Sequence, residues 1–123
     1  METYEDQLNL FFDMPNEEAF LANTISQFKD IETDMNDIVA AWKNGDTHQM
    51  EEYILVKPQK EYPELKDFYH RIYTDRNIKM TRKIADLLTL KDTYFVVVGA
   101  GHLVGQQGIV NLLKENGFRV TQY

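Results

Sequence analysis

The chain has 123 residues, of which 43% are hydrophobic and 12% aromatic. This length and composition are typical of one globular domain, which we expect to span residues 1–123, and not of a disordered chain. The 20 Asp and Glu residues outnumber the 13 Lys and Arg, giving a formal net charge of -7. Because phosphate binding needs a basic face, this acidity argues against nucleic acid as the main partner.

The sequence also argues against a membrane segment. No run approaches the roughly 18 consecutive apolar residues that a membrane helix needs, and the first residues, METYEDQ, are too polar for a signal peptide. We therefore expect the chain as given to be soluble. The absence of cysteine excludes disulfides and cysteine metal sites, but it fits any compartment and leaves the localisation open.

Apolar residues at helical spacing predict two helices near the amino terminus. The first covers residues 4–12 and ends at Asp13-Met14-Pro15. The second covers residues 17–28, with Asn16 as its N-cap.

Two further helices are predicted in the next part of the chain. One covers residues 31–42 and ends at Asn44-Gly45, a pair suited to a left-handed C-cap. Asp46 or Thr47 can then cap a short helix that ends before Pro58.

A longer helical pattern follows Tyr62-Pro63 and continues to Leu88. Arg76 falls near the middle of its apolar stripe, and Asn77 falls at the edge of the stripe. A core-facing Arg needs a carboxylate, carbonyl groups or an anionic ligand as its partner. The alternative is a break in the helix at Thr74-Asp75, with Asp75 capping a new helix and Arg76 exposed.

The last third predicts strands. Residues 93–98 form an apolar run rich in β-branched and aromatic residues, which favours a strand covered on both faces. A helix over 103–115 and a second strand over 118–122 would complete a βαβ unit. We therefore expect an α+β fold that is mostly helical and ends in this unit. Two strands make a poor sheet, so another chain or a missing half should complete it.

Glycines and a histidine follow the first predicted strand in the sequence Gly99-Ala100-Gly101-His102. Gly99, Gly101 and Gly105 are close to a dinucleotide-binding fingerprint. Two features oppose that interpretation, because Val104 occupies the place of the third glycine and the chain ends at VTQY without an acidic residue for the ribose. We therefore interpret these glycines as a sharp binding turn at the end of a strand.

The imidazole of His102 has several possible roles at this turn. It can be a metal ligand, a general base or an anion-binding group, or it can simply hydrogen-bond to nearby backbone. His48 and His70 lie in helical patterns and are expected on the surface. No HExxH motif occurs, and no second histidine stands at ligand spacing from His102.

Taken together, these motifs resemble one known family. The segments Arg76-Asn77-x-x-Met80, Tyr94 to Gly108 and Gly117-Phe118-x-Val120, with Glu2-Thr3-x-Glu5-x-Gln7-Leu8 and Tyr62-Pro63-Glu64-Leu65 upstream, carry the resemblance. They resemble the carboxy-terminal half of the TraB/GumN family, which is related to the Tiki proteins.

The resemblance implies a metal-dependent hydrolase or protease, with manganese or cobalt as the metal. It makes His102 the metal ligand or catalytic histidine and Glu2 a second acidic ligand. It also places Arg76 and Asn77 at the same site. The alternative for Glu2 and Glu5, from their position alone, is that they are carboxylates in the first turn of a helix, where the helix dipole favours negative charge.

The family's amino-terminal half is absent from this sequence, together with its first Gly-x-x-His motif. Because a hydrolytic metal needs about three protein ligands, we expect a truncated domain or fragment that is inactive alone. The missing ligands would come from a homo-oligomer or from the missing half. The alternative is a non-catalytic helical interaction domain that oligomerises.

Overall fold

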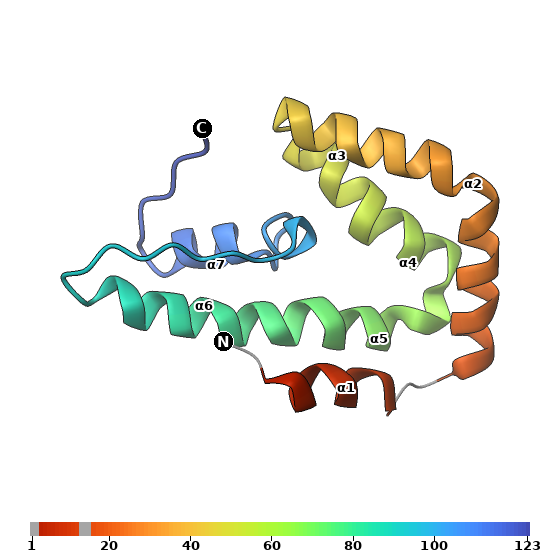
Figure 1. Ribbon diagram of the computed structural model, residues 1–123, viewed down its shortest axis with the longest axis horizontal. Coiled ribbons are helices and arrows are strands. Elements are labelled where there is room, and N and C mark those ends of the chain that lie inside the picture. The colour runs from red at the N-terminus through yellow and green to blue at the C-terminus, as the bar shows by residue number, and fades with distance from the viewer. Residues whose placement is uncertain (1–2, 13–15) are drawn as a thin grey trace.

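In the computed structural model, which describes residues 3–12 and 16–123, helices form the first three quarters of the chain (Figure 1). Helix α1 covers Tyr4–Phe12 and begins at Thr3, whose hydroxyl accepts a hydrogen bond from the Asp6 amide at 3.1 Å. The Thr3 amide in turn donates to the Asp6 carboxylate at 2.9 Å, so the two residues form a capping box. The predicted helix end at Asp13-Met14-Pro15 lies outside the described residues.

Helix α2 covers Glu17–Asn44 and joins the two helices that we expected to be separate. The expectation of a break was wrong because neither glycine nor proline interrupts this segment. Both predicted ends are confirmed. The Asn16 side chain accepts from the Ala19 amide at 3.2 Å, and Gly45 closes the helix at φ 65°.

A second helical run lies beside α2 and consists of α3 (Thr47–Glu51), the π-helical turn η1 (Glu52–Val56) and α4 (Lys57–Glu61). Its predicted N-cap is confirmed, because the Asp46 carboxylate accepts from the Gln49 amide at 2.9 Å. The run continues past Pro58, where we expected it to end. Proline has no backbone N–H, and the wider π turn just before it accommodates the interrupted hydrogen-bond ladder.

A third run crosses below the second in Figure 1 and consists of η2 (Pro63–Leu65), α5 (Lys66–Tyr69), the π turn η3 (His70–Asp75) and α6 (Arg76–Leu88). The predicted long helix is thus confirmed. Asp75 has right-handed helical backbone angles and makes no capping hydrogen bond with its side chain. The alternative of a break at Thr74-Asp75 is therefore wrong.

The predicted carboxy-terminal βαβ unit is not formed. Residues 93–99 and 118–123 have no regular secondary structure, and the described part of the chain contains no strand. The helix between them, α7, covers Ile109–Glu115 and is shorter than expected, because the short 3₁₀ helix η4 (Ala100–His102) and turns precede it. The fold of the described residues is therefore helical and not α+β.

The reason for this error is that a strand depends on a partner. Val98, Phe118 and Val120 pack on a core cluster formed by Met80 of α6 and by Ile109 and Leu113 of α7. Both segments thus rest on the same helix pair without pairing with each other. Phe95 and Val97 point the other way and are 93% and 76% exposed, so the outer face that a second layer would cover is open.

The turn at residues 99–105 lies between two core clusters. Its Ala100 and Val104 pack with Ala41 of α2 and Met50 of α3, while Val98 just before it belongs to the cluster on α6 and α7. The glycine-histidine turn is therefore anchored on both sides. No helix in the described ranges is both long and apolar enough to cross a membrane.

Candidate functional site

The Gly99–His102 segment forms one tight turn that directs the histidine into the protein. The Gly99 carbonyl accepts a hydrogen bond from the His102 amide at 2.9 Å, which closes η4. The His102 side chain is buried, with only 9% of the residue exposed. His48 and His70 are exposed, as expected.

Asn77 and His102 form a buried hydrogen bond, although they are far apart in the sequence. The distance between Asn77 Oδ1 and His102 Nδ1 is 2.6 Å, and only 2% of Asn77 is exposed. The structure thus brings together two of the residues that the sequence singled out. An asparagine at the edge of an apolar helical stripe is buried here because its amide satisfies the turn.

The second hydrogen bond of Asn77 determines which nitrogen of a neutral His102 ring carries the proton. Its Nδ2 donates to the Gln107 carbonyl at 2.7 Å, so its Oδ1 is the atom that faces the imidazole as an acceptor. A neutral His102 must then carry its proton on Nδ1. This leaves the lone pair on Nε2, which is the form required of a metal ligand or a general base.

Tyr73 forms one wall around His102. The two rings lie 5.4 Å apart between centroids and are tilted by 49°. Burial raises the pKa of the Tyr73 hydroxyl, while the positive charge of Arg76 opposes this shift. The hydroxyl therefore stays neutral at physiological pH and can donate a hydrogen bond.

Arg76 lies on the same helical run, one turn after Ile72. Its Nη1 donates to the Ile72 carbonyl at 3.2 Å, so a carbonyl group partly satisfies the half-buried guanidinium, as the sequence suggested. Ile72 belongs to the π turn η3, in which the ordinary α-helical bonding is replaced. The turn thus provides a carbonyl that helps to position the charged group.

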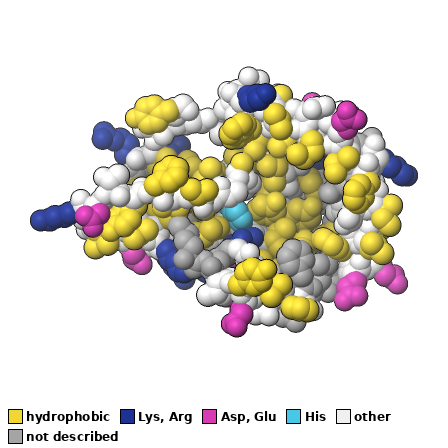
Figure 2. Space-filling view, in the orientation of Figure 1, with side chains coloured by type: hydrophobic (Ala, Val, Ile, Leu, Met, Phe, Trp, Pro, Cys, Tyr) yellow, Lys and Arg dark blue, Asp and Glu magenta, His cyan; other side chains and the backbone are white. Residues whose placement is uncertain are grey.

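Two hollows meet at Arg76. The larger, of about 630 Å³, lies between α2 and the two π turns, and the smaller, of about 510 Å³, lies between α1 and α6. Phe20, Phe68, Tyr69 and Tyr73 give the larger hollow an aromatic wall. Figure 2 shows hydrophobic side chains gathered along the middle of this face.

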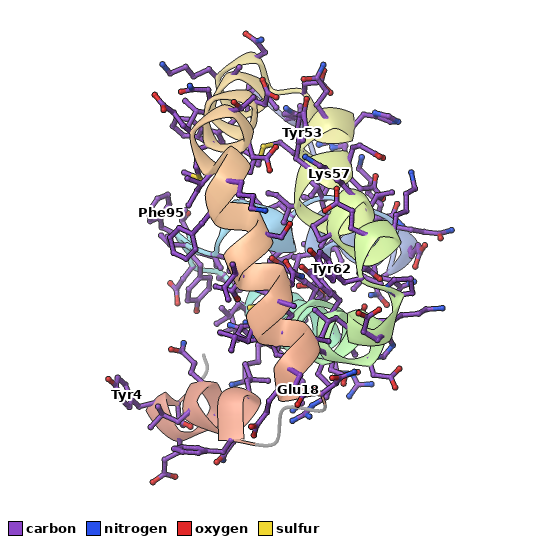
Figure 3. All side chains as sticks on the ribbon, turned by 90° about the vertical axis from the view of Figure 1, so that its right-hand side faces the viewer. Tyr4, Glu18, Tyr53, Lys57, Tyr62 and Phe95 are labelled. Atoms are coloured by element: carbon purple, nitrogen blue, oxygen red, sulfur yellow. The ribbon has the colours of Figure 1, made fainter. Side chains whose placement is uncertain are left out.

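The far side of the larger hollow carries charged and polar groups. Lys57 Nζ and the Asp34 carboxylate form an ion pair at 2.8 Å. The charge of Asp37 raises the pKa of Tyr53, which also lines the hollow. Figure 3 shows Tyr53 and Lys57 on the run beside α2.

The three glycines of the predicted binding turn have different roles. A Cβ atom on Gly101 would lie 2.9 Å from Ile54 Cγ2 and 3.0 Å from Tyr73 Cε1, so only glycine fits between these side chains. Gly105 adopts φ 84°, a left-handed conformation that other residues rarely take. At Gly99 a Cβ would meet only an ordinary contact, 3.7 Å from His102 Cδ2.

A complete metal site is not formed by the described residues. No group of three or more His, Cys, Asp or Glu side chains converges in that part of the chain. The second expected ligand, Glu2, lies outside it. His102, Asn77 and Arg76 share one region, but they do not satisfy the ligand number of a hydrolytic metal.

Tyr73 and the aromatic wall were not predicted from the sequence. Tyr69 and Tyr73 belong to the apolar stripe of the helical pattern that ends at Leu88, and nothing in that stripe sets them apart. The four-residue spacing of Tyr69, Tyr73 and Asn77 on one helix was the available signal, because it places two hydroxyl-bearing rings in line with a polar residue. That the turn brings His102 against Asn77 and Tyr73 could not be predicted from local spacing.

Comparisons with known proteins bear on this site. No solved structure matches the chain. A segment of 49 residues is 39% identical to a protein of Amphimedon queenslandica named "Metalloprotease TIKI homolog". That segment covers 38% of the chain and 10% of the Amphimedon protein, so the similarity spans about a tenth of the relative's length.

The family comparison covers far more of the sequence. The profile of the TraB/PrgY/gumN family matches residues 1–122. This range includes Asn77 and the glycine-histidine turn with His102. The match extends over nearly the whole sequence, and the chain therefore belongs to the TraB/PrgY/gumN family.

Proposed function

We propose that the chain is part of a TraB-type metal-dependent hydrolase and that His102 contributes a ligand or a base to its site. The observation that carries this proposal is the buried hydrogen bond of 2.6 Å between Asn77 and His102. A bond of this kind fixes the tautomer and orientation of a ligating histidine. The same bond also gives the buried imidazole N–H a hydrogen-bond partner.

The neighbouring residues would act on the substrate side. Arg76 would hold an anionic group of the substrate or a carboxylate of the site, since it lies where the two hollows meet. Asn77 is a positioning residue in this scheme, and Tyr73 shields the imidazole from water. The name of the Amphimedon relative supports a peptide as the substrate class.

The remaining ligands must come from elsewhere, because the described residues do not fit a metal alone. We propose Glu2 as one source and a second copy, or the rest of a longer protein, as the other. The chain corresponds in this proposal to the carboxy-terminal half of a complete domain. It would then be inactive as an isolated single copy.

A thermal-shift titration with Co²⁺ or Mn²⁺ tests the role of His102. At a protein concentration that allows copies to associate, we expect the metal to raise the Tm, because a ligand that binds only the folded state stabilises it. The shift should vanish in His102→Ala. In Asn77→Ala it should need about 10–100-fold more metal, the usual cost of losing a partner of a ligating histidine.

His48→Ala is the matched control, because it removes an exposed histidine and should keep the full shift. A wild-type chain that does not respond would contradict the proposal that a second copy completes the site. A His102→Ala variant that responds like the wild type would contradict the role of His102.

A non-catalytic interaction domain is the second candidate. It is favoured by the large apolar side chains that α2 exposes, among them Phe28 at 66% and Trp42 at 65%. In that case His102→Ala would change stability slightly and alter neither assembly nor ligand binding.

A further inference from the structure

The smaller hollow at Arg76 concentrates positive charge in an acidic protein. It lies where α1 runs beside the third helical run (Figure 1), and five basic side chains line it against two acidic ones. Residues 71–83 supply all five, although the chain as a whole has 13 Lys and Arg against 20 Asp and Glu. The five are Arg71, Arg76, Lys79, Arg82 and Lys83. Positive charge gathered around a concave surface attracts an anionic ligand.

The two acidic side chains of this hollow already have partners. The Asp6 carboxylate accepts hydrogen bonds from the Thr3 amide at 2.9 Å and from the Thr3 hydroxyl at 2.8 Å. The Asp75 carboxylate lies 3.4 Å from His70 Nδ1. These two carboxylates therefore leave the hollow with an excess of positive charge.

The basic residues of α6 lie on one face of the helix and act across the hollow. Arg76, Lys79 and Lys83 follow each other at intervals of three and four residues, which places them in line. Hydrogen bonds from Thr3 lower the pKa of Asp6 on α1, and the positive charges of Lys79 and Lys83 lower it further. The positive charge of α6 thus reaches the α1 side of the hollow.

The larger hollow offers a different surface directly beside the smaller one. Arg76 lines both hollows, and the wall of the larger one is aromatic. Its wall residue Tyr73 also contacts the ring of His102, so this hollow lies next to the candidate site. Asp34 and Glu61 line it as well, and their charges would repel an acidic side chain there. A ligand that crosses Arg76 therefore meets apolar surface on one side and positive charge on the other.

We propose that the substrate is a peptide segment with an aromatic or large apolar side chain in the larger hollow and adjacent acidic side chains in the smaller one. The inference rests on the proposed function, in which the substrate is a peptide and Arg76 holds one of its anionic groups. It adds the specificity, because two neighbouring subsites of different chemistry select a sequence that combines both properties. An anionic membrane fits less well, since a flat surface would leave the aromatic hollow unfilled.

NMR titrations of the isotope-labelled chain test peptide binding in the absence of metal. The probes are the acetylated and amidated peptides Gly-Gly-Phe-Asp-Asp and Asp-Asp-Phe-Gly-Gly, so that both chain directions are sampled. We expect at least one of them to shift the amide signals of α6 and of the residues around Tyr73. Replacing its Phe by Gly, or both Asp by Lys, should weaken binding at least about tenfold.

Charge reversal on the protein tests the smaller hollow. Lys79→Glu combined with Lys83→Glu should weaken binding of the acidic peptide at least about tenfold and should strengthen binding of the Lys-containing peptide. Both side chains are exposed, so far-UV circular dichroism should show wild-type helix content. Lys43→Glu combined with Lys91→Glu is the matched control, because it changes the net charge equally at exposed positions outside both hollows.

A charge placed in the larger hollow tests the apolar subsite. Met35 lines this hollow and is 52% exposed, so Met35→Glu should reduce the affinity to that of the peptide without Phe. Leu21→Glu is the control on the same helix, because Leu21 is 60% exposed and lines neither hollow. It should bind the peptide like the wild type.

The outcomes separate this inference from the role of His102. His102→Ala should bind the peptide like the wild type, because the titration contains no metal, whereas its response to Co²⁺ or Mn²⁺ should be lost. No binding of either peptide, or undiminished binding by the double variant at Lys79 and Lys83, would overturn the inference. Binding to phosphatidylserine vesicles without binding of either peptide would overturn it too, and would assign the basic face to a membrane.

Discussion

At the scale of single residues, the Asn77 side chain connects the α6 helix to the glycine-histidine turn. It contacts His102 Nδ1 at 2.6 Å in a buried bond and the Gln107 carbonyl at 2.7 Å in a partly buried one. We expect Asn77→Ala to lower the free energy of unfolding by about 1–3 kcal/mol, because buried polar groups lose their partners. Chemical denaturation measures this change.

Asn111→Ala is the control for that experiment. Asn111 also donates to a backbone carbonyl, that of Gln106 at 2.9 Å, but at the surface. Its loss should cost less than about 0.5 kcal/mol, since water replaces the contact. Equal effects of the two variants would contradict the role assigned to Asn77.

The Tyr73 hydroxyl gives the fold a dependence on alkaline pH. Burial raises its pKa above the ordinary value of 10.0, so folding favours the protonated hydroxyl. This contribution to stability is fully present below about pH 10 and is lost as the pH rises through the folded-state pKa. We expect the free energy of unfolding to fall above about pH 10, and to fall less steeply in Tyr73→Phe.

Tyr69 remains in that variant and burial raises its pKa too, so some of the slope should persist. Tyr4→Phe, at a position that is 81% exposed, should leave the slope unchanged. A Tyr73→Phe variant with the full wild-type slope would show that another group titrates.

At the scale of elements, the turn at residues 99–105 needs Gly105 for its left-handed backbone conformation and Gly101 for its close packing against Ile54 and Tyr73. Gly105 has φ 84°, and a Cβ there would also lie 3.1 Å from the Glu51 carboxylate. We expect Gly105→Ala to cost about 1–2 kcal/mol, the penalty of a left-handed residue with a side chain. Gly99→Ala should change the stability by less than about 0.5 kcal/mol, and similar losses in thermal melts would contradict this distinction.

The helices and their ends were predictable because their causes are local. Asn16, Gly45 and Asp46 act within one turn of the backbone that they cap, so the sequence pattern includes both partners. The strands at 93–98 and 118–122 were wrong because a strand needs hydrogen-bond partners that a local pattern does not contain. The continuity of α2 was missed because residues 17–28 and 31–42 were interpreted as two separate helices.

The candidate site was predictable only in part, for the same reason. The sequence singled out Arg76, Asn77 and His102, yet the bond between Asn77 and His102 joins residues that no spacing relates. Glu2 stays a prediction, because it lies outside the described residues. The contact between Tyr73 and His102 could not be predicted, because it forms only when the turn packs against the third helical run.

At the scale of the whole molecule, two apolar surfaces are open to further chains. One is the outer face of residues 93–98, where Phe95 projects outward in Figure 3, and the other is formed by the apolar side chains that α2 exposes, such as Phe28 and Trp42. Under the proposed function, the metal ligands that the described residues lack would also come from another copy or segment. We therefore propose that other copies or segments complete the site through these surfaces.

Native mass spectrometry of the purified chain, with and without Co²⁺ or Mn²⁺, tests the central claim most directly. We expect a species with two copies that takes up metal stoichiometrically, and we expect His102→Ala to form the same dimer without metal. Metal-free spectra of the wild type under every condition would contradict the claim that a second copy completes a metal site with His102. Metal uptake that persists in His102→Ala would contradict it equally.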